Sequence, residues 1–104
     1  MTARLLVNPA AGRRRGHRLA ARLAAAAAAR GLAVELSTSR EDLVARARRA
    51  SAEGVERLLV AGGDGTWHWV AQALAGSDTA LAPLPVGTGN DLARELRVDR
   101  KSVV

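Results

Sequence analysis

The chain has 104 residues, of which 48% are apolar and 25% are charged, as in one small globular domain with a modest core. It has no Cys, which excludes disulfides and thiolate metal sites, and its Phe, Tyr and Trp content is two Trp. The net charge of +6 favours an anionic partner such as a nucleotide or a lipid head group. Nucleic acid is a minor alternative, because single-strand binding normally uses aromatic stacking platforms.

Charged residues interrupt every apolar run of the chain, so no stretch reads as a membrane span. The N-terminus also lacks an apolar segment of signal-peptide length. We therefore expect a cytoplasmic protein, with peripheral contact at the inner membrane face as a compatible addition.

The first half of the chain alternates strand and helix patterns. The apolar run "ARLLVNP" predicts a strand that ends at Pro9, and "AAGRRRG" then reads as a loop. Helical spacing predicts a helix from His17 to Arg30, which Gly31 ends. "LAVELST" predicts the second strand. The next helix begins at Ser39 as N-cap and ends at Gly54, and its predicted apolar stripe comprises Leu43, Ala47 and Ala50.

The second half continues the alternation. "VERLLVAG" and "TALAPLPVG" predict strands, and "TWHWVAQALAG" and "GNDLARELRV" predict helices. Strands that alternate with helices of this length form a parallel sheet with helices on both faces. The predicted fold is therefore a three-layer α/β/α domain of the α/β class.

Three loops each follow a predicted strand and precede a predicted helix: "NPAAG" (8–12), "GGDGT" (62–66) and "GTGND" (87–91). In an open parallel sheet, such loops gather at the carboxyl ends of the strands, where ligands bind. This common placement is more informative than any one of the motifs.

The "GGDGT" turn has the residue types of a phosphate site. Its glycines allow close approach of a ligand and positive φ, and the following helix start offers free N–H groups. Asp64 beside a phosphate suggests a Mg²⁺ ion, reached directly or through water, or a hydroxyl partner. Thr66 can donate its hydroxyl or cap the helix. The alternative is an ordinary strand–turn–helix link in which Asp64 is the cap.

The other two loops follow the same logic. In "GTGND", two glycines open the turn, Thr88 offers a hydroxyl, and Asn90 or Asp91 starts a helix, although a capped turn is an alternative. Asn8 can bind a base or a phosphate, or form an ordinary Asn-Pro turn. A P-loop and the G-x-G-x-x-G dinucleotide fingerprint are both excluded, because their spacing is not present.

Together, "VNPAAG", "GGDGT" and "PVGTGNDLAR" resemble the N-terminal half of the diacylglycerol kinase catalytic-domain family, which includes bacterial lipid kinases and sphingosine kinases. The resemblance covers about Arg4 to Val98. "GGDGT" alone is shared with NAD kinases and phosphofructokinases, so an NAD-kinase-like enzyme and a non-catalytic nucleotide-binding module remain alternatives. The resemblance implies the nucleotide-binding half of an NAD kinase/phosphofructokinase-like fold in residues 1–98.

The resemblance also implies ATP and Mg²⁺ as cofactors and transfer of the γ-phosphate to a lipid hydroxyl, such as that of diacylglycerol. Asp64 would lie near the metal. The implied ATP-binding positions are Asn8, Ser37, Thr38, Gly62, Gly63, Asp64, Gly65, Thr66, His68, Gly87, Thr88, Gly89, Asn90 and Asp91.

The chain departs from the family pattern directly after "GGDGT". The family usually places Asn and Glu where this chain has His68 and Trp69. His68 can still form hydrogen bonds, but Trp69 cannot replace a carboxylate, so we expect Trp69 to be a buried helix residue and His68 a polar surface residue.

A basic cluster precedes and opens the first predicted helix. It can bind phosphates or an anionic membrane surface, or it can be a solvated helix start; its members are Arg13, Arg14, Arg15, His17, Arg18 and Arg22.

Family members carry a second, mostly β domain that binds the lipid and supplies the general base. We expect that domain to be absent here, so the catalytic base is unassigned and the chain alone should be inactive. An exposed domain-facing surface would favour a homodimer. The tail "DRKSVV" holds the only Lys of the chain. It can be encoded by a sequencing-adapter sequence, so we expect Asp99–Val104 to be an assembly artefact or a disordered tail.

Overall fold

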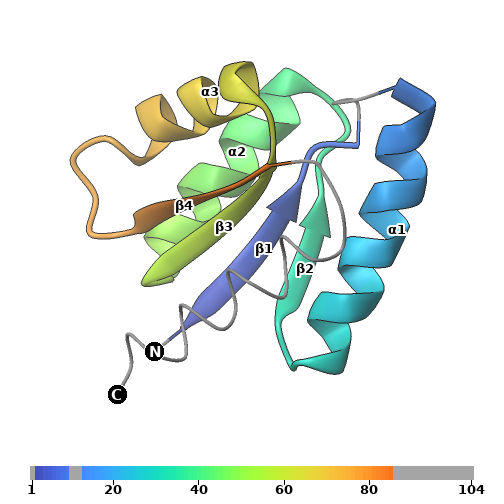
Figure 1. Ribbon diagram of the computed structural model, residues 1–104. Helices are drawn as coiled ribbons and strands as arrows, with labels where there is room; N and C mark the ends of the chain where they lie inside the picture. The colour runs from blue at the N-terminus through green and yellow to red at the C-terminus, as the bar shows by residue number, and fades with distance from the viewer. Residues whose placement is uncertain (1, 10–12, 86–104) are drawn as a thin grey trace.

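The computed structural model describes residues 2–9 and 13–85 of the chain. Strands and helices alternate through these residues, as Figure 1 shows. The elements are β1 (Ala3–Val7), α1 (Arg13–Ala29), β2 (Ala33–Leu36), α2 (Arg40–Ala52), β3 (Arg57–Gly62), α3 (Asp64–Leu74) and β4 (Ala80–Pro85).

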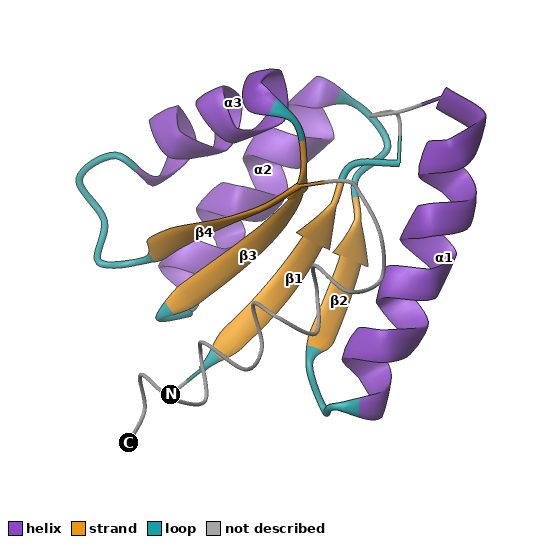
Figure 2. Ribbon diagram, in the orientation of Figure 1, coloured by secondary structure: helices purple, strands orange, loops and turns teal. Residues whose placement is uncertain are grey.

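The four strands form one parallel sheet in the order β2-β1-β3-β4 (Figure 2). The two central strands are therefore β1 and β3, which are far apart in the sequence. Leu5 of β1 is in register with Val34 of β2 and Leu59 of β3. Because all strands point the same way, the loops after β1, β2 and β3 emerge at one edge of the sheet.

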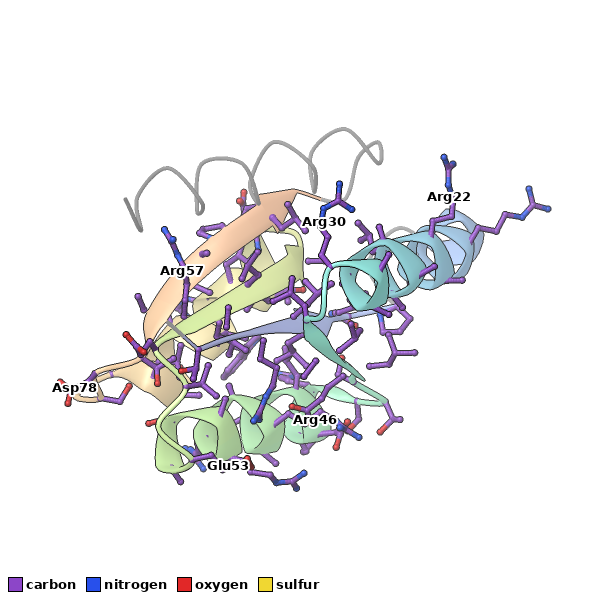
Figure 3. All side chains as sticks on the ribbon, turned by 90° about the horizontal axis from the view of Figure 1, so that it is seen from below. Arg22, Arg30, Arg46, Glu53, Arg57 and Asp78 are labelled. Carbon is purple, nitrogen blue, oxygen red and sulfur yellow. The ribbon has the colours of Figure 1, made fainter. Side chains whose placement is uncertain are left out.

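The central strands β1 and β3 are buried on both faces of the sheet, since successive side chains of a strand point to opposite sides. Leu5 and Leu59 pack with α1 on one face, whereas Leu6 and Val60 pack with α2 and α3 on the other. Figure 3 shows α1 and α2 on opposite sides of the sheet. The predicted three-layer α/β/α architecture is confirmed.

Helix α2 follows its predicted limits closely. The Ser39 hydroxyl accepts a hydrogen bond from the Asp42 amide at 3.0 Å, which caps the helix, and Gly54 after its end has φ of 78°. Leu43, Ala47 and Ala50 are buried, as the apolar stripe predicted.

Two helices begin earlier than the sequence pattern predicted. Helix α1 starts at Arg13, so the expectation that "AAGRRRG" is a loop is wrong for Arg13–Gly16; arginine is a good helix former, and the helix tolerates Gly16. Helix α3 starts at Asp64, because Gly63 takes the extended N-cap conformation and the acidic side chain suits the first turn. The predicted helix in "GNDLARELRV" lies outside the described residues.

Among the residues that the structure describes, no helix has the length and apolarity needed to cross a membrane.

Candidate functional site

The ends of β1, β2 and β3 are joined at one edge of the sheet by backbone hydrogen bonds. The Asn8 amide donates to the Ala61 carbonyl at 3.1 Å, and the Ser37 amide donates to the Val7 carbonyl at 2.9 Å. The Ser37 hydroxyl also donates to the Val7 carbonyl, at 3.3 Å, and this side chain is buried. The loops after these strands are therefore brought together, as the parallel sheet predicted.

One side-chain hydrogen bond links the first loop to the glycine-rich turn. Asn8 Nδ2 donates to Thr66 Oγ1 at 2.9 Å, across the boundary between β1 and α3. Thr66 is only 8% exposed, so its hydroxyl is held in place by burial as well as by Asn8. The polar residue after β1 thus positions the start of α3.

Gly62 is required by the packing of β3 against α3. A Cβ atom built at Gly62 would lie 2.7 Å from Thr66 Cβ and 2.8 Å from both Thr66 Cγ2 and Thr66 Oγ1. No real Cβ makes such contacts, so only glycine lets the strand end lie this close to the first turn of α3.

Gly63 and Gly65 differ from Gly62, because a Cβ at either would meet no atom within 4 Å among the described residues. Gly63 has an extended backbone, with φ of −124°, that any residue can adopt. The expectation of positive φ in this turn is wrong: among the described residues, the glycines with positive φ are Gly31, Gly54 and Gly76. Neither packing nor φ explains the absence of side chains at Gly63 and Gly65.

Asp64 is the first residue of α3 and not its cap. The N-cap is Gly63, with no side-chain capping hydrogen bond, so the alternative in which Asp64 caps the helix does not hold. The carboxylate is exposed and has no ion-pair partner within the described part of the chain. The positive end of the helix stabilises it, and it remains available to a cation.

A pocket of about 290 Å³ lies at this edge, between the first turns of α2 and α3. Its lining includes the predicted residues Asn8, Thr38, Gly65 and Thr66. The other described lining residues are Ser39, Arg40, Leu43 and Trp69, for which the sequence pattern predicted no ligand role. One sequence feature could have indicated them. Ser39 caps α2 directly after β2, so the start of α2 must lie at the ligand-binding edge of the sheet.

The loop that carries Thr38 is held by a hydrogen bond to Asp42, whose carboxylate also forms an ion pair with Arg46 within α2. Asp42 Oδ2 accepts from the Thr38 amide at 2.9 Å and from Arg46 Nε at 2.7 Å. The Arg46 hydrogen bond, followed by that from the Thr38 amide, lowers the pKa of Asp42 below its ordinary value. Arg46 also pairs with Glu35 of β2 at 2.8 Å, and the same interactions raise its pKa. Figure 3 shows Arg46 beside the sheet.

His68 and Trp69, which follow the glycine-rich turn, are both more exposed than Thr66. His68 is exposed and its Nε2 lies 3.2 Å from Gln72 Nε2, away from the lining of the pocket, so its ATP contact remains a prediction. The expectation that Trp69 is buried is wrong, since the residue is 37% exposed. The buried stripe of α3 runs through Thr66, Val70 and Leu74, and Trp69 points away from it.

The remaining predicted residues are those of the "GTGND" loop and those of the basic cluster. Gly87, Thr88, Gly89, Asn90 and Asp91 lie outside the described residues. Of the basic cluster, Arg18 and Arg22 have exposed side chains, and Figure 3 shows Arg22 pointing away from the sheet.

The family model of the diacylglycerol kinase catalytic domain matches residues 2–104. The chain belongs to this family. A diacylglycerol kinase of Mycobacterium tuberculosis is 45% identical over 53 residues, which cover 51% of this chain and 17% of that protein. A protein of Pseudomonas fluorescens named "Probable lipid kinase YegS-like" is 43% identical over 65 residues, covering 61% and 22% of the two chains.

The fold of this diacylglycerol kinase-family chain is also that of a solved relative. The crystal structure of a diacylglycerol kinase from Bacillus anthracis superposes with a TM-score of 0.65 at 31% identity. The match covers 93% of this chain and 37% of that structure. The NAD kinase-like fold expected from the resemblance is therefore confirmed. The chain spans about a fifth of the length of the named relatives and about a third of the solved one.

Proposed function

We propose that residues 1–98 are the ATP-binding half of a lipid kinase that transfers the γ-phosphate of ATP to a lipid hydroxyl. The open space beside two glycines of the turn is the main support for nucleotide binding. Gly63 and Gly65 leave open space beside a helix N-terminus, at the same edge where Asn8, Thr38 and Thr66 line a pocket. Glycines that the fold does not need are explained by a ligand that approaches the main chain.

The charge distribution at this edge suits a triphosphate. The N-termini of α2 and α3 both face the pocket, and each carries a partial positive charge and free N–H groups. Arg40, the first residue of α2, adds a full positive charge to the lining. The phosphates would lie along Gly63, Gly65 and Thr66.

The residues present also fit a magnesium ion. Asp64 is an exposed carboxylate beside the proposed phosphate positions, and carboxylate and phosphate oxygens are the ligands that Mg²⁺ prefers. The ion would neutralise phosphate charge during transfer. Asp64 would hold it directly or through water, and this coordination would offset the repulsion between the carboxylate and the phosphates.

The acceptor half of the reaction belongs to a second domain in our proposal. Transfer breaks the bond between the γ-phosphorus and the bridging oxygen of ADP and forms one to the lipid oxygen, and a base must take the hydroxyl proton. Relatives named as diacylglycerol kinase make diacylglycerol the first acceptor to test, presented at a membrane surface. We propose that this chain binds ATP without transferring phosphate.

Calorimetric titration with Mg-ATP, together with an assay of labelled phosphate transfer to diacylglycerol in mixed micelles, tests this proposal. We expect weak ATP binding and no labelled lipid, because the second domain would supply half of the cleft. Failure to bind ATP at millimolar concentration would refute the nucleotide assignment, and labelled lipid would refute the need for a second domain. NAD replaces the lipid in a parallel assay, where labelled product would favour the NAD-kinase-like alternative.

A further inference from the structure

The two tryptophans of α3 lie in different environments. Trp67 is half-buried against the core, and its Nε1 donates to the Val60 carbonyl at 2.8 Å. Trp69 is 37% exposed, and its indole contacts Arg40 and His68. The exposed third of this indole contributes no burial free energy, so the fold alone does not require an aromatic residue at this position.

Arg40 holds Trp69 from the neighbouring helix. The guanidinium carbon of Arg40 lies 4.8 Å from the centroid of the Trp69 ring, a distance typical of a cation–π interaction. The His68 ring meets the indole edge-on, with the ring centroids 5.6 Å apart. The Arg40 contact connects α2 to α3 and holds an indole that lines the pocket.

Arg40 is placed where a cation is unfavourable without an anion nearby. It is the first residue of α2, at the positive end of the helix dipole, and it has no ion pair among the described residues. The pair formed by Arg40 and Trp69 lines the 290 Å³ pocket and also a more open hollow that includes Glu41, Val44 and Arg48. The pair is therefore a wall of the site and not part of the core.

We propose that Trp69, held by Arg40, binds the base of the nucleotide by stacking. This inference rests on the proposed function and names the part of the site that holds the base. The pocket volume of about 290 Å³ is just below the range for drug-sized ligands, roughly 300–1,000 Å³, and is compatible with a base. Leu43 supplies an apolar surface, Thr38 and Ser39 supply hydroxyl groups, and the phosphates extend to Gly65.

Stacking on an indole depends on the π-face that every base has, so it discriminates weakly between bases. We therefore expect ATP and GTP to bind this chain with affinities within about fivefold of each other. Inorganic tripolyphosphate has no base, and its binding should not depend on Trp69.

The test compares Trp69→Ala with Trp69→Phe in calorimetric titrations with Mg-ATP and with magnesium tripolyphosphate. Loss of a base–aromatic stack should weaken ATP binding by about tenfold in Trp69→Ala, whereas Trp69→Phe should retain most of the affinity. Tripolyphosphate affinity should change by less than about twofold in both variants.

Tryptophan fluorescence adds a readout that a purely structural role would not move. In Trp67→Phe the remaining indole is that of Trp69, and stacking with ATP should quench its emission. In Trp69→Phe the remaining indole is that of Trp67, and ATP should leave its emission unchanged.

The outcomes separate this inference from the proposed function. If ATP binds the natural chain and Trp69→Ala binds it equally well, base stacking on Trp69 is refuted and nucleotide binding stands. Equal losses of ATP and tripolyphosphate affinity would also refute it, because the effect would lie in the phosphate site. If neither ligand binds the natural chain, both proposals fail.

Discussion

Asn8 Nδ2 and Thr66 Oγ1 are 2.9 Å apart, although their residues are separated by 58 positions in the sequence. The bond joins the residue that follows β1 to the first turn of α3. It exists because β1 and β3 are neighbours in the sheet, so that the first loop and the glycine-rich turn share one edge. This contact makes the two sequence motifs parts of one site.

Replacing Thr66 by Val removes the hydroxyl and keeps the shape of the side chain. We expect a loss of about 1 kcal/mol in the free energy of unfolding, because the partly buried hydrogen bond from Asn8 to this hydroxyl is lost. We also expect weaker Mg-ATP binding. Urea unfolding and calorimetric titration of the same variant measure the two effects.

Thr79→Val is the matched control for that variant. Thr79 is also 8% exposed, and its hydroxyl donates one hydrogen bond, to the Val55 carbonyl at 2.6 Å, at the opposite edge of the sheet. It should lose similar stability and retain ATP affinity. Equal ATP affinities in the two variants would show that Thr66 matters only for stability.

Gly62→Ala should destabilise the chain by roughly 1–3 kcal/mol, since the new methyl group would overlap the Thr66 side chain. The strand end and α3 would have to separate to accommodate it. Urea unfolding measures the cost. A variant as stable as the natural chain would contradict the packing role assigned to Gly62.

Gly65→Ala should have the opposite effect on stability. Alanine meets no atom within 4 Å at this helical position, and its higher helix propensity should stabilise the chain by about 0.5–1 kcal/mol. The methyl group would occupy the proposed approach of the phosphates, so Mg-ATP affinity should fall. A stabilised variant with unchanged ATP affinity would argue against a phosphate site beside Gly65.

Asp42→Asn tests the carboxylate that accepts from the Thr38 amide and pairs with Arg46. The folded pKa of Asp42 is lowered from its ordinary 3.8, so the stabilisation is present above about pH 4 and is lost as the pH falls through the folded pKa. The variant should be less stable than the natural chain near pH 6, and the difference should shrink toward pH 3. Urea midpoints across this range measure it.

Glu41→Gln is the control for Asp42→Asn, because it removes the same charge from the same helical turn. Glu41 forms no ion pair among the described residues, so its removal should cost less. A difference between Asp42→Asn and the natural chain that stays constant from pH 6 to pH 3 would contradict the ionic contribution.

Local signals in the sequence were sufficient for the strand–helix alternation and for α2. Ser39 and Gly54 are strong start and stop signals, and the apolar spacing between them is unambiguous. The start of α1 was predicted too late, because Arg13–Gly16 carry no cap signal and include a glycine. The alternation of strands with helices also predicted the parallel sheet. A parallel sheet in turn places the loops that follow its strands at one common edge.

Contacts within the site could not be predicted from local patterns. The Asn8–Thr66 bond depends on the strand order, and the contact between Arg40 and Trp69 depends on how α2 and α3 lie beside each other. Trp69 was expected to be buried because large aromatic residues usually are. The rotation of α3 instead buries Thr66, Val70 and Leu74.

Amide chemical-shift mapping by NMR shows whether Mg-ATP binds at the carboxyl edge of the sheet. Titration of the labelled chain should shift the amides of Thr38, Gly63 and Gly65 most strongly. Gly54 and Gly76, which lie with Thr79 beside a hollow away from that edge, should be unaffected. Larger shifts at Gly54 and Gly76, or no shifts at saturating ATP, would rule out a nucleotide site at this edge.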